Sequence, residues 1–504
     1  MKSEVKKGIV LNYVLLFATN IIGLIYTPFL IRNLGQSEYG LYSLVNSIIG
    51  YLFILDFGFS NALVVYASKY KMQNKEEELK KLYGMFKLAY YIIAGIAAFL
   101  GLILYFNISN IFGNTMTIAE ISKAKVLMLI LSFNLVINFA FTIYNSIIIF
   151  NEKFVFQKGM NLLITILKPF IMLPLLLLGA KSISLAIITT VLNMVIIIAN
   201  YIYCKKKLNV NIKICSFDKV LAIEILVYSF YIFLSSVVDK VNWSVDQVIL
   251  GTVSGTIAVS VYAVASQINM MYINFSSAIA NVMLPKISKI VAQSNSKKQL
   301  DEEFIKVGRI QYIIIFLILT GFIIFGKDFI MVWAGKEYIM AYYITIILIV
   351  PVTIPLAQNL GISILQAKNM HKFRSLLYLG VAICNVLISI PLAKMYGGVG
   401  CAIGTGLSLF ISNGIIINIY YYKKVNLDII SFWKNILKIT LKEVVPLVFI
   451  ILFVSYTNFS SFYNLLIGIP IYSLLYCLYT YKFVLNRYEK DLVLIPFRKL
   501  KLVK

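Results

Sequence analysis

The chain has 504 residues, of which 60% are hydrophobic and only 13% are charged. Soluble globular proteins contain roughly 45–50% apolar and about 25% charged residues, so this composition excludes an ordinary soluble domain and predicts an integral membrane protein. The formal net charge of +25 would suggest nucleic-acid binding in a soluble protein, but here the positions of the basic residues decide its meaning.

Apolar runs of about 20 residues, enough to cross a hydrocarbon layer of about 30 Å, recur along the whole chain. The longest polar connection, near residues 284–309, is too short for a separate soluble domain. We therefore expect an all-α membrane protein of about fourteen spans, at roughly 9–31, 40–66, 85–107, 124–148, 159–179, 182–203, 222–248, 256–284, 310–333, 339–366, 375–396, 399–422, 443–458 and 461–482.

The basic segments between these spans all fall on one side of the membrane if the N-terminus is cytoplasmic. These segments are MKSEVKK, KYKMQNKEEELKK, NEKFVFQK, KKKLNVNIK, PKISKIVAQSNSKKQ, AKNMHKFR, YKKVNLD and the tail from Lys482. This distribution follows the positive-inside rule, and it predicts that both termini are cytoplasmic. The basic residues would then face anionic membrane lipids, and we expect no nucleic-acid partner.

An internal repeat is visible when residues 40–70 are laid over residues 260–290. GLYSLVNS at 40–47 lies over SVYAVASQ at 260–267, and DFGFSNALVVYASKY at 56–70 lies over SSAIANVMLPKISKI at 276–290. NLG at 33–35 resembles ILG at 249–251, four residues out of step. The repeat predicts two parallel six-helix lobes at 1–203 and 222–422, two extra helices at 443–482, and a basic cytoplasmic tail at 483–504. Parallel repeats of this kind suggest a transporter whose site lies near the midplane between the lobes.

Polar residues interrupt the spans that begin each lobe. The first carries Asn20 and, at its outer end, Arg32. The second carries Asn46, Asp56 and Asn61, and helical spacing puts Asn46 and Asp56 near one face. The seventh carries a stripe of Ser235, Asp239, Asn242, Trp243 and Asp246 with Lys240 beside it, and the eighth carries Gln267, Asn274 and Asn281. We expect these stripes to face a hydrated cleft.

The fifth span contains Lys168 directly before Pro169, too deep in its helix to reach water easily by extending its side chain. A carboxylate or ammonium at mid-membrane depth costs about 2.5–3.5 kcal/mol on insertion scales, so Lys168 and Asp56 point to a cavity role. Simpler explanations stay open for the others. The asparagines also fit interhelical hydrogen bonding, Asp239 and Lys240 could neutralise each other, and Arg32 and Asp246 also fit a wet position at the outer interface.

The five cysteines form no CxxC pair, and the single histidine, His371, has no partner of its kind. We therefore expect neither a disulfide nor a metal site. No GxxxxGK[ST] phosphate loop is present, so ATP hydrolysis and a bound cofactor are not expected.

Residues 12–70, NYVLLFATNIIGLIYTPFLIRNLGQSEYGLYSLVNSIIGYLFILDFGFSNALVVYASKY, resemble the N-terminal signature of Wzx-type polysaccharide-biosynthesis flippases. VDQVILGTVSGTIAVSVYAVASQI at 245–268 and LPKISKI at 284–290 agree with the same family. These flippases belong to the multidrug/oligosaccharidyl-lipid/polysaccharide exporter superfamily, and the similarity runs from residue 8 to about 425. The resemblance implies a MATE-like fold in a bacterial cytoplasmic membrane, and a transporter rather than an enzyme.

The implied substrate is an undecaprenyl-pyrophosphate-linked oligosaccharide that alternating access turns from the inner to the outer leaflet. Lys168, Lys240 and Arg32 are the candidate cations for its pyrophosphate, and the polar stripes are candidates for its sugars. Asp56, Asp239 and Asp246 are the candidate carriers of H⁺ or Na⁺, although Asp56 also fits a structural role in bracing the second helix. A polysaccharide polymerase and glycosyltransferases of the same pathway are possible partners.

Other functions fit the sequence less well. A cation or drug antiporter of the same superfamily is the main alternative, and it predicts a cavity dominated by acidic residues. A cell-wall precursor flippase is also compatible. A polymerase or ligase is disfavoured because the longest outer loop, at 107–124, holds no His, Cys or paired carboxylate. A structural scaffold would leave the repeat and the polar stripes unexplained.

Overall fold

The computed structural model describes residues 2–210, 212, 219–280, 284–291, 296–368, 370–456 and 462–499, and within these ranges it contains helices and no strand. The chain divides into two compact units, Met1–Ala263 with Ala393–Gly398, and Val264–Leu392 with Val399–Lys504. An all-helical fold is what the composition predicted. The proposed lobe limits at 203 and 222 stay a prediction, and α7 belongs to the first unit.

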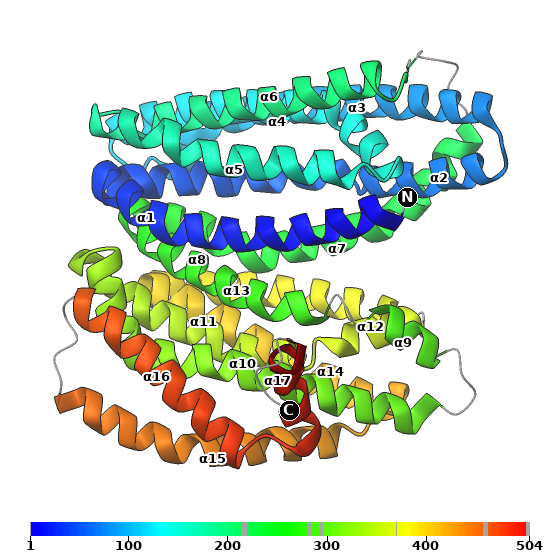
Figure 1. Cartoon of the computed structure of the whole chain (residues 1–504). Coiled ribbons are helices and arrows are strands. Elements are labelled where there is room, and N and C mark those ends of the chain that lie inside the picture. Colours follow the sequence, from blue (N-terminus) through cyan, green and yellow to red (C-terminus); the bar gives the residue numbers. More distant parts are fainter. Residues whose placement is uncertain are drawn as a thin grey trace. The chain divides into compact units, whose positions relative to one another are not determined.

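Apart from the short segment Ala393–Gly398, the described part of the first unit contains seven helices, one 3₁₀ turn and the start of an eighth helix, and Figure 1 labels the helices. These elements are α1 (Lys2–Leu52), η1 (Phe53–Asp56), α2 (Phe59–Met72), α3 (Glu76–Phe112), α4 (Ile118–Phe150), α5 (Phe154–Leu177), α6 (Ser182–Lys206), α7 (Lys219–Val253) and α8 (Gly255–Ala280), the last of which continues into the second unit.

The second unit repeats the pattern of long helices and adds two helices and a short C-terminal one. Its elements are α9 (Leu284–Val291), α10 (Ser296–Trp333), η2 (Lys336–Tyr338), α11 (Met340–Ala357), α12 (Leu360–Ala367), α13 (His371–Leu409), the π-helical η3 (Phe410–Ile416), α14 (Ile417–Tyr420), the π-helical η4 (Tyr421–Val425), α15 (Ile429–Tyr456), α16 (Phe462–Phe483) and α17 (Arg487–Lys499). Phe304, Tyr421 and Phe432 form a fully buried aromatic cluster in this unit.

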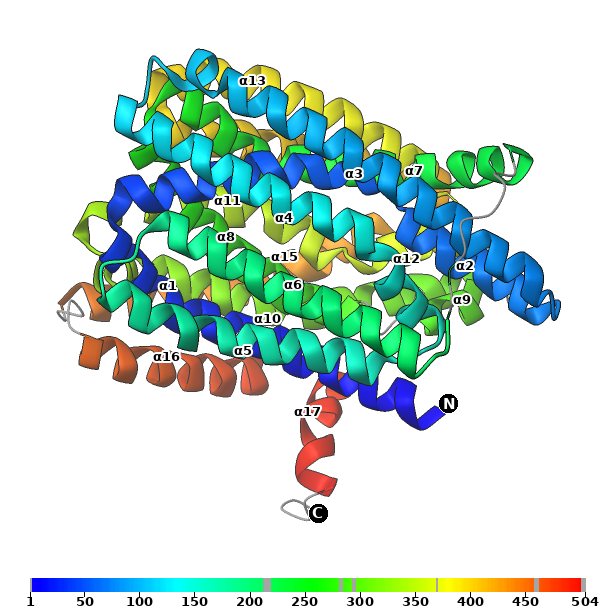
Figure 2. The ribbon, with the colours of Figure 1, turned by 90° about the horizontal axis from the view of Figure 1, so that it is seen from above.

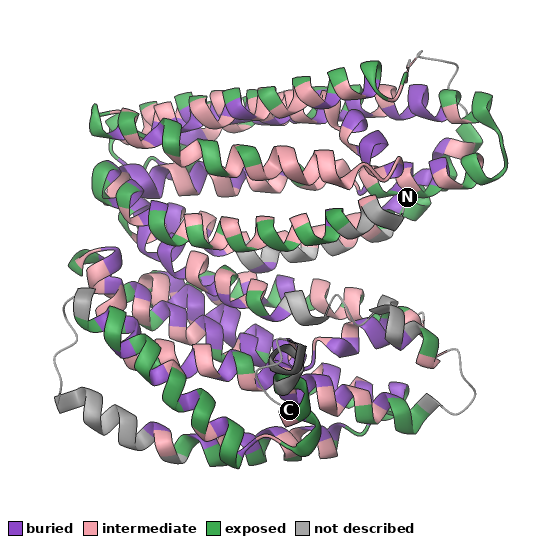
Figure 3. Cartoon of the chain, viewed as in Figure 1, coloured by how far each residue is buried: buried purple, intermediate pink, exposed green. Residues whose placement is uncertain are grey.

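Ten helices in the described part of the chain are long and apolar enough to cross a membrane. Two of these, Lys7–Met72 and Phe373–Val425, each contain a glycine with positive φ, Gly35 and Gly397, so each joins two predicted spans. Buried, intermediate and exposed positions alternate along each helix (Figure 3), as expected for helices that bury one side only. The number fourteen stays a prediction.

The internal repeat has a structural counterpart. The shift that lays position 40 over position 260 also lays Gly35, inside α1, over Gly255, at the start of α8, and both glycines have φ of 78°. The same shift lays Glu76, where α3 begins, over Ser296, where α10 begins. In this register Gly35 corresponds to Gly255 rather than to Gly251, so the resemblance of NLG at 33–35 to ILG at 249–251 lies four residues outside the structural repeat.

The segment QSEYG at 36–40 fixes the kink in α1. Ser37 Oγ and Thr256 Oγ1 donate to Glu120 Oε1 at 2.5 and 2.7 Å, while Lys123 and Ser182 both donate to the buried Glu38 carboxylate. Gly40 packs so tightly on the backbone of Thr256 that a Cβ at position 40 would overlap the carbonyl oxygen. These contacts hold the start of α8 against α1 and α4.

Candidate functional site

The second half of α1, together with α2, packs antiparallel against α7 within the first unit. Four residue pairs mark the register of this packing. The two residue numbers of each pair add up to nearly the same value, as antiparallel helices require. The pairs are Ser47–Gln247, a 2.6 Å hydrogen bond, Gly50–Lys240, Phe57–Phe233, with ring centroids 4.3 Å apart, and Tyr66–Glu224, a 3.2 Å hydrogen bond. The predicted polar residues of the second and seventh spans therefore share one seam.

Lys240 and Asp246 occupy different environments along this seam. Lys240 is partly exposed, and its Nζ lies 3.6 Å from the position that a Cβ on Gly50 would take. It has no hydrogen bond or ion pair among the described residues. Asp246 is only 3% exposed and accepts a hydrogen bond from the Tyr262 hydroxyl. The idea that Asp246 is simply wet at an interface is therefore wrong, because protein covers its side chain.

Asp56 lies in a break between α1 and α2. The single helix expected over 40–66 was wrong: a 3₁₀ turn at Phe53–Asp56 is followed by Phe57 and Gly58, with φ of 51° and 72°. Two successive residues with positive φ cannot continue a right-handed helix, so the spacing that put Asn46 and Asp56 on one face does not hold.

The Asp56 carboxylate faces hydroxyl groups rather than a cation. Its Oδ1 accepts hydrogen bonds from Tyr90 Oη at 3.3 Å and from Ser60 Oγ at 3.5 Å, and the two hydroxyls lie 3.0 Å apart. Ser60 stands in the first turn of α2 and Tyr90 on α3. The carboxylate thus joins the turn to both helices.

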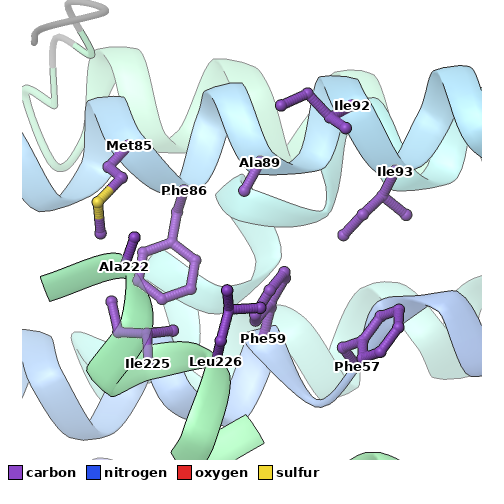
Figure 4. Close-up of a pocket in the computed structure, with 10 residues that line it drawn as sticks. All are labelled: Phe57, Phe59, Met85, Phe86, Ala89, Ile92, Ile93, Ala222, Ile225 and Leu226. Atoms are coloured by element: carbon purple, nitrogen blue, oxygen red, sulfur yellow. The ribbon is translucent and has the colours of Figure 1, made fainter. Parts of the chain in front are cut away.

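An apolar pocket of about 300 Å³ lies beside this turn (Figure 4). The rings of Phe57, Phe59 and Phe86 and the side chain of Leu226 line it, with no polar side chain in its wall. Such a pocket offers neither a charge nor a hydrogen bond to a sugar or a phosphate, so a polar substrate site must be sought elsewhere in the unit.

Helix α5 carries a continuous polar stripe that ends at Lys168. Gln157, Asn161, Thr165 and Lys168 follow spacings of four, four and three, which places them within about 80° of one another around the helix. The exposed apolar side chains, Leu163, Leu167 and Phe170 among them, lie on the opposite side. The stripe therefore faces away from the lipid-exposed surface of α5, into the unit.

Helix α4 carries a second stripe with the same spacing. Asn134, Asn138, Thr142 and Asn145 again fall within about 80° of one another. Val126, Leu129 and Phe133 are exposed on the far side of this helix. The α4–α5 hairpin brings the two stripes together at one end, where Gln157 Nε2 donates to Asn145 Oδ1 at 3.0 Å.

The other end of the α4 stripe is tied to α6. Asn193 Nδ2 donates to Asn134 Oδ1 at 2.6 Å. We call the nine residues of these stripes the polar track; they are Asn134, Asn138, Thr142, Asn145, Gln157, Asn161, Thr165, Lys168 and Asn193. All nine are partly exposed rather than sealed in the packed core, although Gln157, Asn145, Asn193 and Asn134 are also hydrogen-bonded to one another in pairs.

Lys168 is the charged residue of the polar track. It lies 14 residues after Phe154, or about 21 Å along α5 at 1.5 Å per residue. Its side chain has no hydrogen bond or ion pair among the residues that the structure describes. Pro169 cannot donate a backbone hydrogen bond, so the carbonyl of Thr165 lacks its usual intrahelical donor. A cation and a carbonyl that lacks its usual i+4 donor therefore lie next to each other on the track.

The other predicted site residues are scattered. Asn20 and Asn46 each bond to their own helix, at 2.8 and 3.1 Å to the carbonyls of Leu16 and Tyr42. Asn61 and Arg32 are exposed, and Asn242 is buried. Gln267 and Asn274 belong to the second unit. Asn281 and the side chains of Asp239 and Trp243 lie outside the described part of the chain.

Sequence reasoning missed the α4 stripe and most of the α5 stripe. Each asparagine on its own fits ordinary helix packing, and only the identical spacing on two consecutive helices distinguishes the set. That spacing was present in the sequence at 134–145 and 157–168. Reasoning from the sequence also missed three buried charged residues in the described part of the second unit, Arg309, Glu443 and Glu489.

The helices, the repeat and the inward polar track define a multi-pass membrane protein of the transporter and flippase class of folds. The chain belongs to the family described as "Polysaccharide biosynthesis protein", whose model matches residues 5–291. The resemblance inferred from residues 12–70 is confirmed. No curated protein matches the chain.

Solved structures with the same fold include flippases and transporters. The lipid II flippase MurJ in an inward closed conformation is similar over 96% of this chain and 100% of its own, with a TM-score of 0.71 and 20% identity. An inward-facing multidrug resistance MATE family transporter of the MOP superfamily matches 84% of this chain and 99% of its own, with a TM-score of 0.64 and 13% identity. A MATE transporter from Vibrio cholerae matches 85% and 98%, with a TM-score of 0.56 and 14% identity. At these identities the likeness concerns the fold.

Proposed function

We propose that the protein is a flippase that moves an undecaprenyl-pyrophosphate-linked oligosaccharide from the inner to the outer leaflet of a bacterial cytoplasmic membrane. The observation that carries this proposal is the polar track: nine partly exposed polar residues on the inward faces of α4, α5 and α6, with Lys168 unpaired among the described residues. Membership of a polysaccharide biosynthesis family supports the choice of a glycan substrate.

The chemistry of the track suits a glycan headgroup. Amide and hydroxyl groups both donate and accept hydrogen bonds, so they can replace the water around sugar hydroxyls without favouring one sugar. Lys168 supplies a positive charge for the pyrophosphate as a point charge that does not impose a bidentate geometry. Lys240, against Gly50, and Arg32 are further candidates for the same anion. The polyprenyl tail stays in the lipid throughout.

Transport by alternating access needs a source of energy other than ATP, and we assign Asp56, Asp239 and Asp246 as the candidate carriers of H⁺ or Na⁺. Asp246 is covered by protein and bonded to Tyr262. Asp56 is held by two hydroxyls, a setting that fits the structural role in bracing α2 better than ion exchange. Asp246 is therefore the stronger candidate of the two whose side chains are described.

A cation or drug antiporter is the second candidate function, favoured by the buried carboxylate of Asp246 on the seam between α1 and α7. An antiporter of this kind would bind its substrate through an acid, whereas a glycan flippase needs Lys168. The two functions therefore differ in which charge is essential.

Both termini lie on the cytoplasmic side in this proposal, and the glycosyltransferases that build the oligosaccharide act on that side. A polymerase that joins the delivered units would act on the outer side. These enzymes are the partners that the reaction sequence requires, whether or not they touch the flippase.

The first experiment is depletion of the protein in its native host, followed by mass spectrometry of polyprenyl-pyrophosphate lipids. We expect one lipid-linked oligosaccharide to accumulate on the cytoplasmic side while one surface polymer disappears. Unchanged lipids with intact surface glycans, together with new sensitivity to cationic dyes, would establish the antiporter instead.

The second experiment tests the site by complementing the depleted strain with variants. Lys168→Gln is expected to lower export more than tenfold, and Lys168→Arg to restore most of it because the charge is retained. Lys181→Gln is the matched control, since Lys181 is an exposed lysine at the N-cap of α6. If Lys168→Gln and Lys181→Gln export equally well, Lys168 does not bind the substrate.

A further inference from the structure

The C-terminal helix α17 begins directly after the last apolar helix. α16 ends at Phe483 and α17 begins at Arg487, so only residues 484–486 separate the start of α17 from the end of a membrane-spanning segment. Figure 2 shows α17 running across the direction of α16 and away from it. A helix that leaves a membrane span in this way starts at the membrane surface.

The first turn of α17 is closed by a reciprocal cap. Asn486 Oδ1 accepts from the backbone N–H of Glu489 at 2.9 Å, and Glu489 Oε2 accepts from the backbone N–H of Asn486 at 2.8 Å. This arrangement satisfies two backbone donors that a helix start otherwise leaves open. The direction of α17 is therefore set from its first residue.

Glu489 also anchors α17 to α10 through an ion pair. Arg309 Nε donates to Glu489 Oε1 at 2.6 Å, and its Nη2 donates to Oε2 at 3.0 Å. Arg309 is 9% exposed and Glu489 only 3%. A planar two-point contact fixes orientation as well as position. Removing one partner would leave the other buried without its counter-charge.

A second contact continues the anchor. Lys306, one turn before Arg309 on α10, lies 5.4 Å from the ring centroid of Tyr488. The N-terminal turn of α17 is thus held by α10 on one side.

On its exposed side, α17 displays apolar and basic side chains together. Tyr488, Leu492 and Val493 are 45%, 36% and 45% exposed, and Arg487 is exposed as well. From residue 487 to 504 the sequence has six basic residues and two acidic ones, Glu489 and Asp491. Since Arg309 already neutralises Glu489, the rest of the segment is strongly positive.

Exposed apolar side chains beside basic ones are the mark of a helix that lies in a membrane interface. The apolar groups enter the boundary of the acyl chains, and the cations meet anionic headgroups. A soluble partner would also accept such a surface, but the three-residue connection to α16 places it at the lipid.

We propose that α17 is an interfacial helix that binds the anionic headgroups of the leaflet at which α16 ends, fixed to α10 by the Arg309–Glu489 ion pair. The affinity of α17 for an anionic surface is expected to rise about fivefold for each basic residue near that surface. It is expected to fall at high salt, because salt screens the charges.

Hydrogen exchange of the full-length protein in lipid nanodiscs tests this proposal. One set of nanodiscs contains phosphatidylcholine alone, and the other contains a mixture of phosphatidylcholine and anionic phosphatidylglycerol. We expect the backbone amides of 490–499 to exchange more than tenfold more slowly with phosphatidylglycerol, and this protection to fall at high salt. Equal exchange rates of these amides in both nanodiscs would overturn the proposal. Protection that stays the same at high salt would overturn it as well.

Two variants separate the charges from the anchor. Arg487→Gln with Lys490→Gln should remove most of the lipid-dependent protection, whereas Lys80→Gln with Lys81→Gln, an equal loss of charge from α3, should leave it intact. Glu489→Gln should speed exchange at 486–490 in both nanodiscs while 491–499 stay sensitive to phosphatidylglycerol. Loss of lipid sensitivity in the α3 control would show that net charge, rather than α17, is responsible. None of these readouts requires transport, so they hold whether or not the proposed flippase function does.

Discussion

Gly35 and Gly255 occupy equivalent positions of the internal repeat and share a φ of 78°. Gly35 also has ψ of 168°, a region of backbone space that is open almost only to glycine. Each glycine turns the chain at the end of one apolar helix and the start of the next. The repeat found in the sequence is therefore a repeat of backbone geometry, and the two glycines mark equivalent corners of it.

The strain at Gly35 can be measured separately from steric overlap. A Cβ at position 35 would meet no atom within 4 Å, so Gly35→Ala changes only the backbone energy. We expect it to lower the free energy of unfolding by about 1–3 kcal/mol. Thermal unfolding of the purified protein would report this loss.

Gly95→Ala is the control for this change. Its Cβ also meets no atom within 4 Å, but Gly95 has no positive φ and lies inside α3. Alanine is the better helix former there by roughly 0.5–1 kcal/mol, so we expect equal or higher stability. Equal melting of the two variants would show that the φ at Gly35 carries no strain.

Variants of the Asp56–Tyr90 contact distinguish a structural role of Asp56 from a role as the carrier of H⁺ or Na⁺. If the carboxylate joins the turn to α3, Asp56→Asn and Tyr90→Phe should destabilise the protein through the same interaction. A double-mutant cycle should then give a coupling of about 1 kcal/mol, and the pH dependence of export should be unchanged in both variants. A flattened pH profile in Asp56→Asn alone would favour ion coupling.

The sequence predicts the features that depend on neighbouring residues, and it does not predict those that depend on contacts between residues far apart in the chain. The membrane spans follow from local composition, and the repeat follows from a comparison of the chain with itself. The break at 53–58 was not predicted because DFG reads as part of an apolar run, and the contacts that hold the turn are distant in sequence: Phe57 stacks on Phe233 of α7, and Tyr90 of α3 donates to Asp56. The anchor of α17 joins residues 180 positions apart, which no local pattern reveals.

The polar track offers a test of substrate contact against simple helix packing. Interhelical hydrogen bonds in membranes stabilise by about 0.6 kcal/mol on average, so Asn193→Leu should cost little stability even though Asn134 loses its donor. If the track binds the glycan, export should nevertheless fall more than tenfold. Thr19→Val is the control, because Thr19 is exposed and its hydroxyl donates to the Leu15 carbonyl of its own helix at 2.8 Å, its one hydrogen bond among the described residues. If export falls only in proportion to the amount of folded protein, the polar track serves helix packing and does not contact the substrate.

Asp428 provides a prediction about pH outside the membrane-spanning segments. Its carboxylate accepts from the backbone N–H of Ser431 at 2.9 Å and so caps the first turn of α15. Hydrogen bonds from the Ser431 side chain and backbone hold the pKa of this carboxyl below its usual value. Because the pKa of Asp428 is lower in the folded state, the ionised cap adds its full share to the free energy of unfolding above the pKa that Asp428 has in the unfolded chain. That share is lost as the pH falls through the lower pKa of the folded state.

Asp428→Ala should therefore cost about 1 kcal/mol of unfolding free energy at neutral pH, and the difference from the unaltered protein should shrink below about pH 4. Asp428→Asn is the matched variant, since an amide oxygen can still cap but does not titrate. Thermal unfolding from pH 3 to 8 in one detergent would show the convergence of the alanine variant with the unaltered protein. A constant difference across that range would mean that the ionised carboxylate adds nothing to the cap.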